Sequence, residues 1–134
     1  MANAIYDKGA EKIWKGEIDL LTDTIKVALI KNTYAQNLAA DEFYSDISAY
    51  VLNTPQALSG RSVTGKVFDA SDVTFASVTA GDTSEGVVIY KDTGVAGTSP
   101  LLFYIDDITY FPATTSGADI TVQWSNGSYK IVSL

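Results

Sequence analysis

The chain has 134 residues, with 46% hydrophobic and 19% charged residues, the composition of one ordinary globular domain, which excludes a wholly disordered protein. Its formal charge of −7 opposes non-specific binding to nucleic acid or to an anionic membrane. Because cysteine and histidine are both absent, disulfides, thiolate metal sites, cysteine nucleophiles and every histidine-containing triad are excluded.

The first stretch, MANAIYDKGAEKIWKG, mixes acidic residues with lysines and has no long apolar core, so we expect no signal peptide. No apolar run approaches the ~20 residues that cross a bilayer, which predicts a soluble protein.

Residues 2–15 are predicted to form a short amphipathic helix. Its apolar positions fall on one stripe: Tyr6, Ala10, Ile13 and Trp14. Asn3 is expected to cap the start and Gly16 to follow the end, whereas Gly9 weakens the helix by about 1 kcal/mol. The helix therefore depends on docking through Trp14. Docking onto its own sheet is favoured, and docking onto a neighbour would make residues 1–16 an assembly arm.

The next segments mix a strand with a loop. Residues 24–31 alternate in polarity, which predicts a half-buried strand. Residues 32–48 keep no such period and indicate an ordered surface loop, in which Asp41 is expected to cap one helical turn. Residues 51–58 predict an irregular edge strand because Pro55 cannot donate to a ladder.

Residues 62–68 and 73–78 are predicted to be two strands joined by a turn at 69–72, with a bulge at Gly65. The stretch 84–107 then holds two continuous apolar runs, 87–90 and 101–105. Neither run alternates, so both faces of each strand should be buried, and the rest of the chain should pack around them.

The chain ends in a predicted hairpin. Residues 120–124 and 129–133 both alternate in polarity, and Asn126-Gly127 between them favours a type I′ turn. Together these elements predict a mainly β protein, in which residues 1–134 form one antiparallel β-sandwich of about seven to eight strands with one short N-terminal α-helix.

Acidic side chains are the only plausible catalytic groups. The pairs are Asp19 with Asp23, Asp69 with Asp72, and Asp106 with Asp107. None has the spacing of a calcium loop or of a glycosidase acid pair, and Asp is common at turns for structural reasons. We therefore expect no enzyme, no cofactor and no metal.

Aromatic side chains in polar segments are more informative, because tyrosine is enriched in protein interfaces. The alternative is that these rings cover the ends of the sandwich with their hydroxyls in water. The candidate interface residues are Tyr6, Ile13, Trp14, Tyr34, Phe43, Tyr44, Tyr50, Tyr110 and Phe111.

Five stretches stand out along essentially the whole chain: ANAIYDKGAEKIWKGEIDLLTDTIKVALI, DEFYSDIS, VFDASDVTFASVT, VVIYKDTG and GADITVQWSNGSYKIVSL. In order and spacing they resemble a family of small structural proteins of tailed-bacteriophage virions, capsid-associated or fibre-related. The sequence departs from that pattern at Tyr110-Phe111 before Pro112. The family pattern has no catalytic residues to carry over.

The resemblance implies a virion protein made in the host cytoplasm. A capsid cement or decoration protein, self-associating and bound to the major capsid protein, is the first expectation. A tail or fibre component acting as adaptor or host-recognition module is the second. A carbohydrate-active enzyme using paired Asp is the third and the least supported by the acid spacing.

Overall fold

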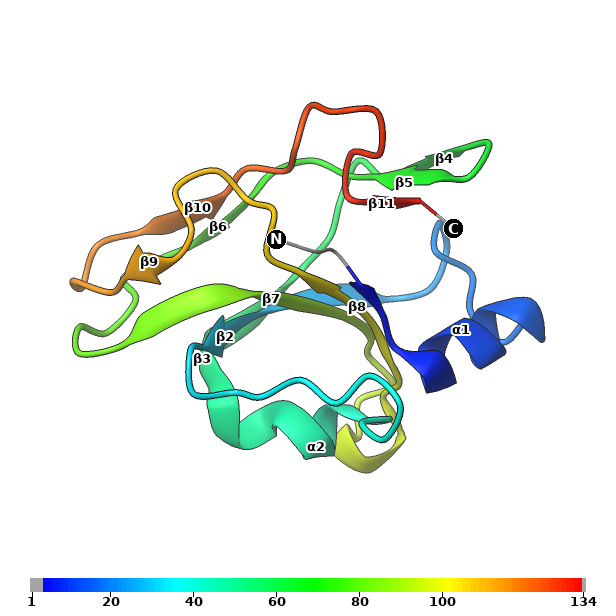
Figure 1. The fold of residues 1–134 in the computed structure, drawn as a ribbon, viewed down its shortest axis with the longest axis horizontal. Coiled ribbons are helices and arrows are strands. Elements are labelled where there is room, and N and C mark those ends of the chain that lie inside the picture. The colour runs from blue at the N-terminus through cyan, green and yellow to red at the C-terminus, as the bar shows by residue number, and fades with distance from the viewer. Residues whose placement is uncertain (1–3, 134) are drawn as a thin grey trace.

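The structure is a computed structural model that describes residues 4–133. Within that range the chain is mainly β, with an antiparallel main sheet, two small antiparallel sheets and two short α-helices (Figure 1). The main sheet has the order β1-β8-β7-β2-β3, and β9 pairs with the start of β7. Its strands are β1 (Ala4–Ile5), β2 (Ile25–Lys31), β3 (Val51–Ala57), β7 (Thr83–Lys91), β8 (Leu101–Ile105) and β9 (Ala113–Thr114).

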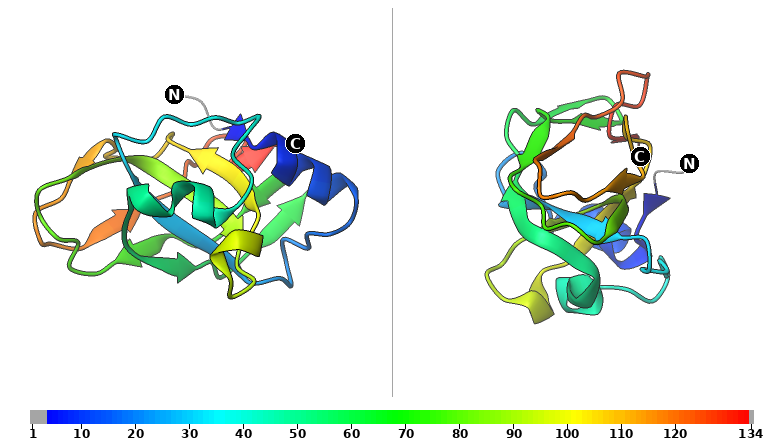
Figure 2. Two further views of the ribbon diagram at one scale, coloured as in Figure 1. Left: turned by 90° about the horizontal axis from the view of Figure 1, so that it is seen from below. Right: turned by 90° about the vertical axis from the view of Figure 1, so that its left-hand side faces the viewer.

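The two small sheets lie over one face of the main sheet, as Figures 1 and 2 show. One pairs β10 with β6, and the other has the order β11-β5-β4. Their strands are β4 (Ser62–Thr64), β5 (Val67–Asp69), β6 (Val73–Phe75), β10 (Ile120–Val122) and β11 (Val132–Ser133). The helical segments are α1 (Asp7–Trp14), α2 (Tyr44–Ile47) and two 3₁₀ turns, η1 (Ser48–Tyr50) and η2 (Ala96–Thr98).

The prediction for the two central strands is confirmed. Every residue of β8 is buried, and β7 is buried from Gly86 to Tyr90. Side chains from one face of these strands join a core with the small sheets, through residues such as Phe103 and Phe75. Side chains from the other face, such as Tyr104, join a second core with residues of the 32–50 segment. The main sheet is therefore covered on both faces.

That double cover corrects the prediction of a half-buried strand at residues 24–31. The alternation exists, since Val27 and Ala28 belong to opposite cores, but both side chains are fully buried because β2 lies between β7 and β3. The irregular edge strand at residues 51–58 is confirmed as β3, whose pairing with β2 shifts register.

The predicted C-terminal hairpin is wrong. β10 pairs with β6 and β11 pairs with β5, so the two segments diverge. Trp124 explains why: its backbone N–H donates to Asp72 Oδ1 at 3.1 Å, and its indole Nε1 donates to the Ser71 carbonyl at 3.0 Å. These bonds tie the chain to the β5–β6 connection instead of to its own return.

A hairpin forms instead where one strand with a bulge was predicted. Thr64 pairs with Val67, which leaves Gly65 and Lys66 as a two-residue turn between β4 and β5. Gly65 has φ of +60°, the left-handed conformation that such turns require.

The N-terminal helix is confirmed but is shorter than predicted. Residues 4–5 are extended because they pair with Tyr104 and Phe103 of β8, so the helix begins at Asp7 after Tyr6. The predicted cap, Asn3, lies outside the described residues. Gly16 follows the helix with φ of +75°, as expected.

The loop prediction for residues 32–48 is confirmed in part, since α2 is the single helical turn. Its N-cap residue is Phe43 and not Asp41, and Asp46 inside the turn reaches back, its Oδ2 accepting from the Glu42 and Phe43 N–H groups. No helix in residues 4–133 has the length and apolarity needed to cross a membrane.

Candidate interaction surface

Helix α1 is docked onto its own sheet through its smallest residue. Gly9 is buried, and a side chain there would collide with the Leu101 carbonyl oxygen and lie 3.0 Å from the Leu102 Cα. The Tyr6 N–H donates to the Leu102 carbonyl at 3.0 Å and fixes the start of the helix. Gly9 therefore permits the close helix–strand contact that the sequence assigned to Trp14.

Trp14 faces water instead. It is 84% exposed at the end of α1, while Ile13 beside it packs against the core. Asp7, Glu11 and Trp14 are spaced at i, i+4 and i+7, and all three are exposed, so they form the outer stripe of the helix. A tryptophan exposed on a docked helix has little backbone conformational freedom to lose in a contact.

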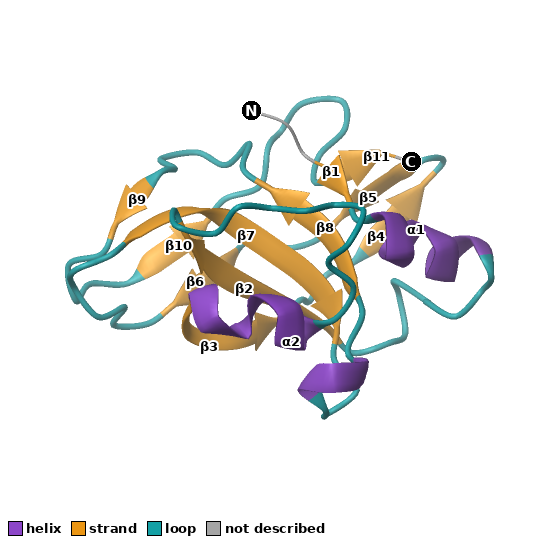
Figure 3. Cartoon of the chain, turned by 60° about the horizontal axis from the view of Figure 1, so that its bottom comes forward, coloured by secondary structure: helices purple, strands orange, loops and turns teal. Residues whose placement is uncertain are grey.

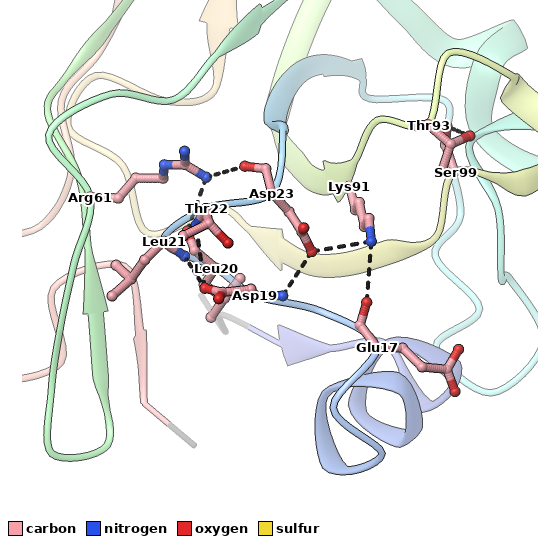
Figure 4. A network of polar contacts seen from close by, with 10 residues as sticks. All are labelled: Glu17, Asp19, Leu20, Leu21, Thr22, Asp23, Arg61, Lys91, Thr93 and Ser99. Carbon is pink, nitrogen blue, oxygen red and sulfur yellow. Dashed lines mark hydrogen bonds and ion pairs between the residues drawn. The ribbon is translucent and has the colours of Figure 1, made fainter.

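A polar network fixes the chain that follows α1 (Figure 4). Asp19 Oδ1 accepts from the N–H groups of Leu21 and Thr22, and Asp23 Oδ2 accepts from the Asp19 N–H at 2.8 Å. Lys91 Nζ lies 3.1 Å from the same Asp23 oxygen. These backbone hydrogen bonds hold the pKa values of the Asp19 and Asp23 carboxyls below their usual value.

Arg61 joins this loop to β4. Its guanidinium donates to the carbonyl oxygens of Leu20 and Asp23, and it comes directly before the strand. Leu21 on the loop is 47% exposed, and Val63 on β4 is 46% exposed. Figures 1 and 3 place α1 and β4 at the same end of the molecule. We call this end, with Trp14, Leu21 and Val63, the α1 end.

A hollow of about 570 Å³ lies at the same end, beside β11 and the β4–β5 turn. Lys66, Tyr129 and Lys130 line it, together with Ser125 and Ser128. Asp107 also lines it. We call this hollow the lysine hollow.

The nine predicted interface residues fall into three groups. Tyr6 and Tyr34 are buried inside the chain and have no ring surface to offer a partner. Trp14 and Tyr110 are 84% and 88% exposed. The remaining five are partly buried. Four of them pack against the cores, Ile13, Tyr44, Tyr50 and Phe111, and Phe43 lies under Lys12, whose Nζ is 5.6 Å from its ring centroid.

The buried tyrosines form one network. The Tyr34 hydroxyl donates to Asp41 Oδ2 at 2.6 Å, so the Tyr6 hydroxyl donates to Tyr34, 2.8 Å away. The Tyr34 ring also contacts the rings of Tyr50 and Tyr104. Burial, and next the hydrogen bond to Asp41, raises the pKa of Tyr34, and burial raises that of Tyr104 to about 12.

The structure adds exposed residues that the sequence did not indicate. Tyr129 is 68% exposed because the predicted hairpin does not form, and Val95 is 60% exposed in the loop that contains η2. Leu21 is a third such residue. The signal for it was Asp19 followed by an Asp four residues later, a pairing that closes a turn and leaves the tip in water.

The acidic pairs have structural contacts. Asp19 and Asp23 cap the loop described above, and Asp72 accepts from Trp124. Among residues 4–133, no three acidic side chains gather as a metal ligand set would.

No protein-family model matches this chain, and no curated protein matches it. The function is therefore argued from the residues above.

Proposed function

We propose that the protein is a non-enzymatic structural protein of a tailed-bacteriophage virion. We place it on the head shell, where it binds the major capsid protein as a decoration protein. The sequence resemblance supplies the virion context. The observation that supports binding is Trp14, an 84% exposed aromatic on a helix that Gly9 and Tyr6 hold against β8.

The architecture supports this proposal. The chain is mainly β, with two small sheets over one face of the main sheet, and we propose that these layers act as one sandwich that presents its exposed loops without rearrangement. The carboxylates that an enzyme would use are engaged in turns instead, as Asp19, Asp23 and Asp72 show. A net charge of −7 favours protein partners over nucleic acid or membrane.

The first experiment is imaging of purified virions at a resolution that traces this chain. Density repeated over the icosahedral shell is the expected result. Density confined to the tail would favour the tail or fibre component instead. Absence from the particle would contradict a virion role altogether.

The second experiment is co-sedimentation of the purified protein with shells of the major capsid protein. Trp14→Ala should weaken binding by at least about tenfold, because buried interface tryptophans are common hot spots. Val95→Ala is the matched control, since Val95 is also exposed but lies in another loop. Equal binding by both variants and the parent would exclude Trp14 as the anchor.

A further inference from the structure

The pair Asn126-Gly127 lies in an exposed loop because the predicted C-terminal hairpin does not form. β10 and β11 pair with other strands, so no ladder holds the pair in a tight turn. The loop runs from Trp124, which is bonded to the β5–β6 connection, to Ile131, whose N–H donates to the Phe68 carbonyl at 3.2 Å. Figure 1 shows it in red, standing away from the main sheet. Both residues of the pair are exposed to water.

The backbone nitrogen of Gly127 is open to its neighbouring side chain. An added Cβ at Gly127 would meet only the Ser125 Oγ within 4 Å, at 3.2 Å. The Gly127 N–H donates to that same hydroxyl at 3.1 Å, an exposed hydrogen bond that rotation of the serine side chain breaks. Among the described residues, the Asn126 side-chain amide has no hydrogen-bond partner. Nothing therefore holds the amide carbon of Asn126 away from the glycine nitrogen.

The other asparagines in residues 4–133 each precede a residue larger than glycine: Asn32, Asn37 and Asn53. Asn53 is also held on both sides of its amide. Its Nδ2 donates to the Ala76 carbonyl at 2.8 Å, and its Oδ1 accepts from the Thr54 N–H at 2.9 Å. The branched Thr54 side chain crowds the nitrogen that follows Asn53. In that part of the chain, only Asn126 has a glycine after it.

We propose that Asn126 is a site of spontaneous deamidation, with the Gly127 backbone nitrogen as the nucleophile. That nitrogen attacks Asn126 Cγ, so a bond forms between them and the bond from Cγ to Nδ2 breaks. The nitrogen's proton leaves with the amide group as ammonia, and a cyclic imide remains. Water then opens the imide at either carbonyl and gives aspartate or isoaspartate at position 126. No atom changes its oxidation state, and water is the sole co-reactant.

The conversion changes the charge beside the lysine hollow. A neutral amide becomes a carboxylate, so the formal charge of −7 becomes more negative by one unit. The new carboxylate arises between Ser125 and Gly127, which both line the hollow. It lowers the positive potential that Lys66 and Lys130 contribute there. Isoaspartate also adds a methylene group to the main chain, which the loop accommodates because both of its ends are fixed. This change goes beyond the proposed binding to the shell and does not involve Trp14.

The test is incubation of the purified full-length protein at neutral pH, followed by proteolysis and mass spectrometry. The peptide that contains Asn126 should lose its amide over time and give separate aspartyl and isoaspartyl products. The peptide that contains Asn53 should keep its amide and serves as the internal control. Asparagine is among the thermolabile residues, so warming should shorten the time that this takes.

Gly127→Ala is the matched variant. The φ of Gly127 is not positive and its Cβ position meets only a serine hydroxyl, so the variant should fold like the parent. Its methyl group crowds the attacking nitrogen and should slow the loss of the Asn126 amide severalfold. A free peptide of residues 123–130, incubated alongside, shows how fast the unrestrained pair reacts.

Three results would overturn the proposal. The first is an Asn126 amide that survives in the protein while the free peptide is converted. The second is equal loss at Asn126 and Asn53, or equal rates in the parent and Gly127→Ala. The third is aspartate without isoaspartate, because direct hydrolysis of the amide gives that product and the imide gives both.

Discussion

At the scale of single residues, Gly9 decides where α1 lies. A methyl group there would meet the Leu101 carbonyl oxygen and lie 3.2 Å from the Leu101 carbonyl carbon. Gly9→Ala gains about 1 kcal/mol of helix propensity but costs more through this overlap, typically 1–3 kcal/mol. We expect a net loss of stability in urea denaturation.

The control is Gly97→Ala in η2. An added Cβ at Gly97 has no neighbour within 4 Å, and its φ is not positive, so stability should change by less than about 0.5 kcal/mol. Equal effects at the two glycines would show that α1 does not dock through Gly9.

The Tyr6–Tyr34–Asp41 network makes a second prediction at this scale. Tyr34→Phe removes the acceptor of the buried Tyr6 hydroxyl and the donor to Asp41, which should cost about 1–3 kcal/mol. Tyr6→Phe in addition removes the Tyr6 hydroxyl that Tyr34→Phe leaves without an acceptor. The double variant should therefore lose less stability than the sum of the two single variants, measured by urea denaturation. Strict additivity would show that the hydroxyls do not interact.

At the scale of elements, β1 and α1 belong to the domain's own core. Deleting residues 1–16 removes Tyr6, which is fully buried, and leaves β8 paired only with β7. The truncated chain should therefore lose cooperative thermal unfolding, as seen by calorimetry. Trp14→Ala should leave the melting temperature nearly unchanged, since Trp14 is exposed. A truncated chain that unfolds like the parent would mean that α1 is a detachable arm.

The sequence predicts elements well where local pattern and final environment agree. The runs at 87–90 and 101–105 have apolar residues on both faces because both faces are covered. The hairpin prediction for residues 120–133 is wrong because Trp124 bonds to Ser71 and Asp72, which lie far away in the chain. Trp14 was expected to dock because apolar residues usually do, yet Gly9 fills that role. The sequence could not show that Gly9 is the contact residue, because this follows from where the Leu101 backbone lies.

At the scale of the whole molecule, carboxylates with lowered pKa values make the folding stability depend on pH. Backbone hydrogen bonds hold the pKa values of Asp19 and Asp23 below 3.8, and the Lys26 ammonium does so for Asp92. On acidification the unfolded chain takes up these protons first, so stability present above pH 3.8 is lost as pH falls through the lower folded values.

We therefore expect the melting temperature to fall steeply below pH 4. Asp23→Asn should flatten part of this slope, because it removes one of the depressed carboxyls. Asp119→Asn is a control with another exposed carboxylate, which accepts from the Ser77 N–H. A melting temperature that stays constant from pH 5 to about pH 2 would contradict the role of these carboxylates.

The edges of the main sheet also decide whether strands of different copies can pair at high protein concentration. β3 holds Pro55, which has no N–H to donate, and Asn53 with φ of 60°, which breaks the regular ladder. β1 at the opposite edge has only two residues. Neither edge offers a long template for an incoming strand, so crowded copies are protected against fibrillar stacking. A high local concentration of the protein should therefore not lead to pairing through the backbone of the main sheet.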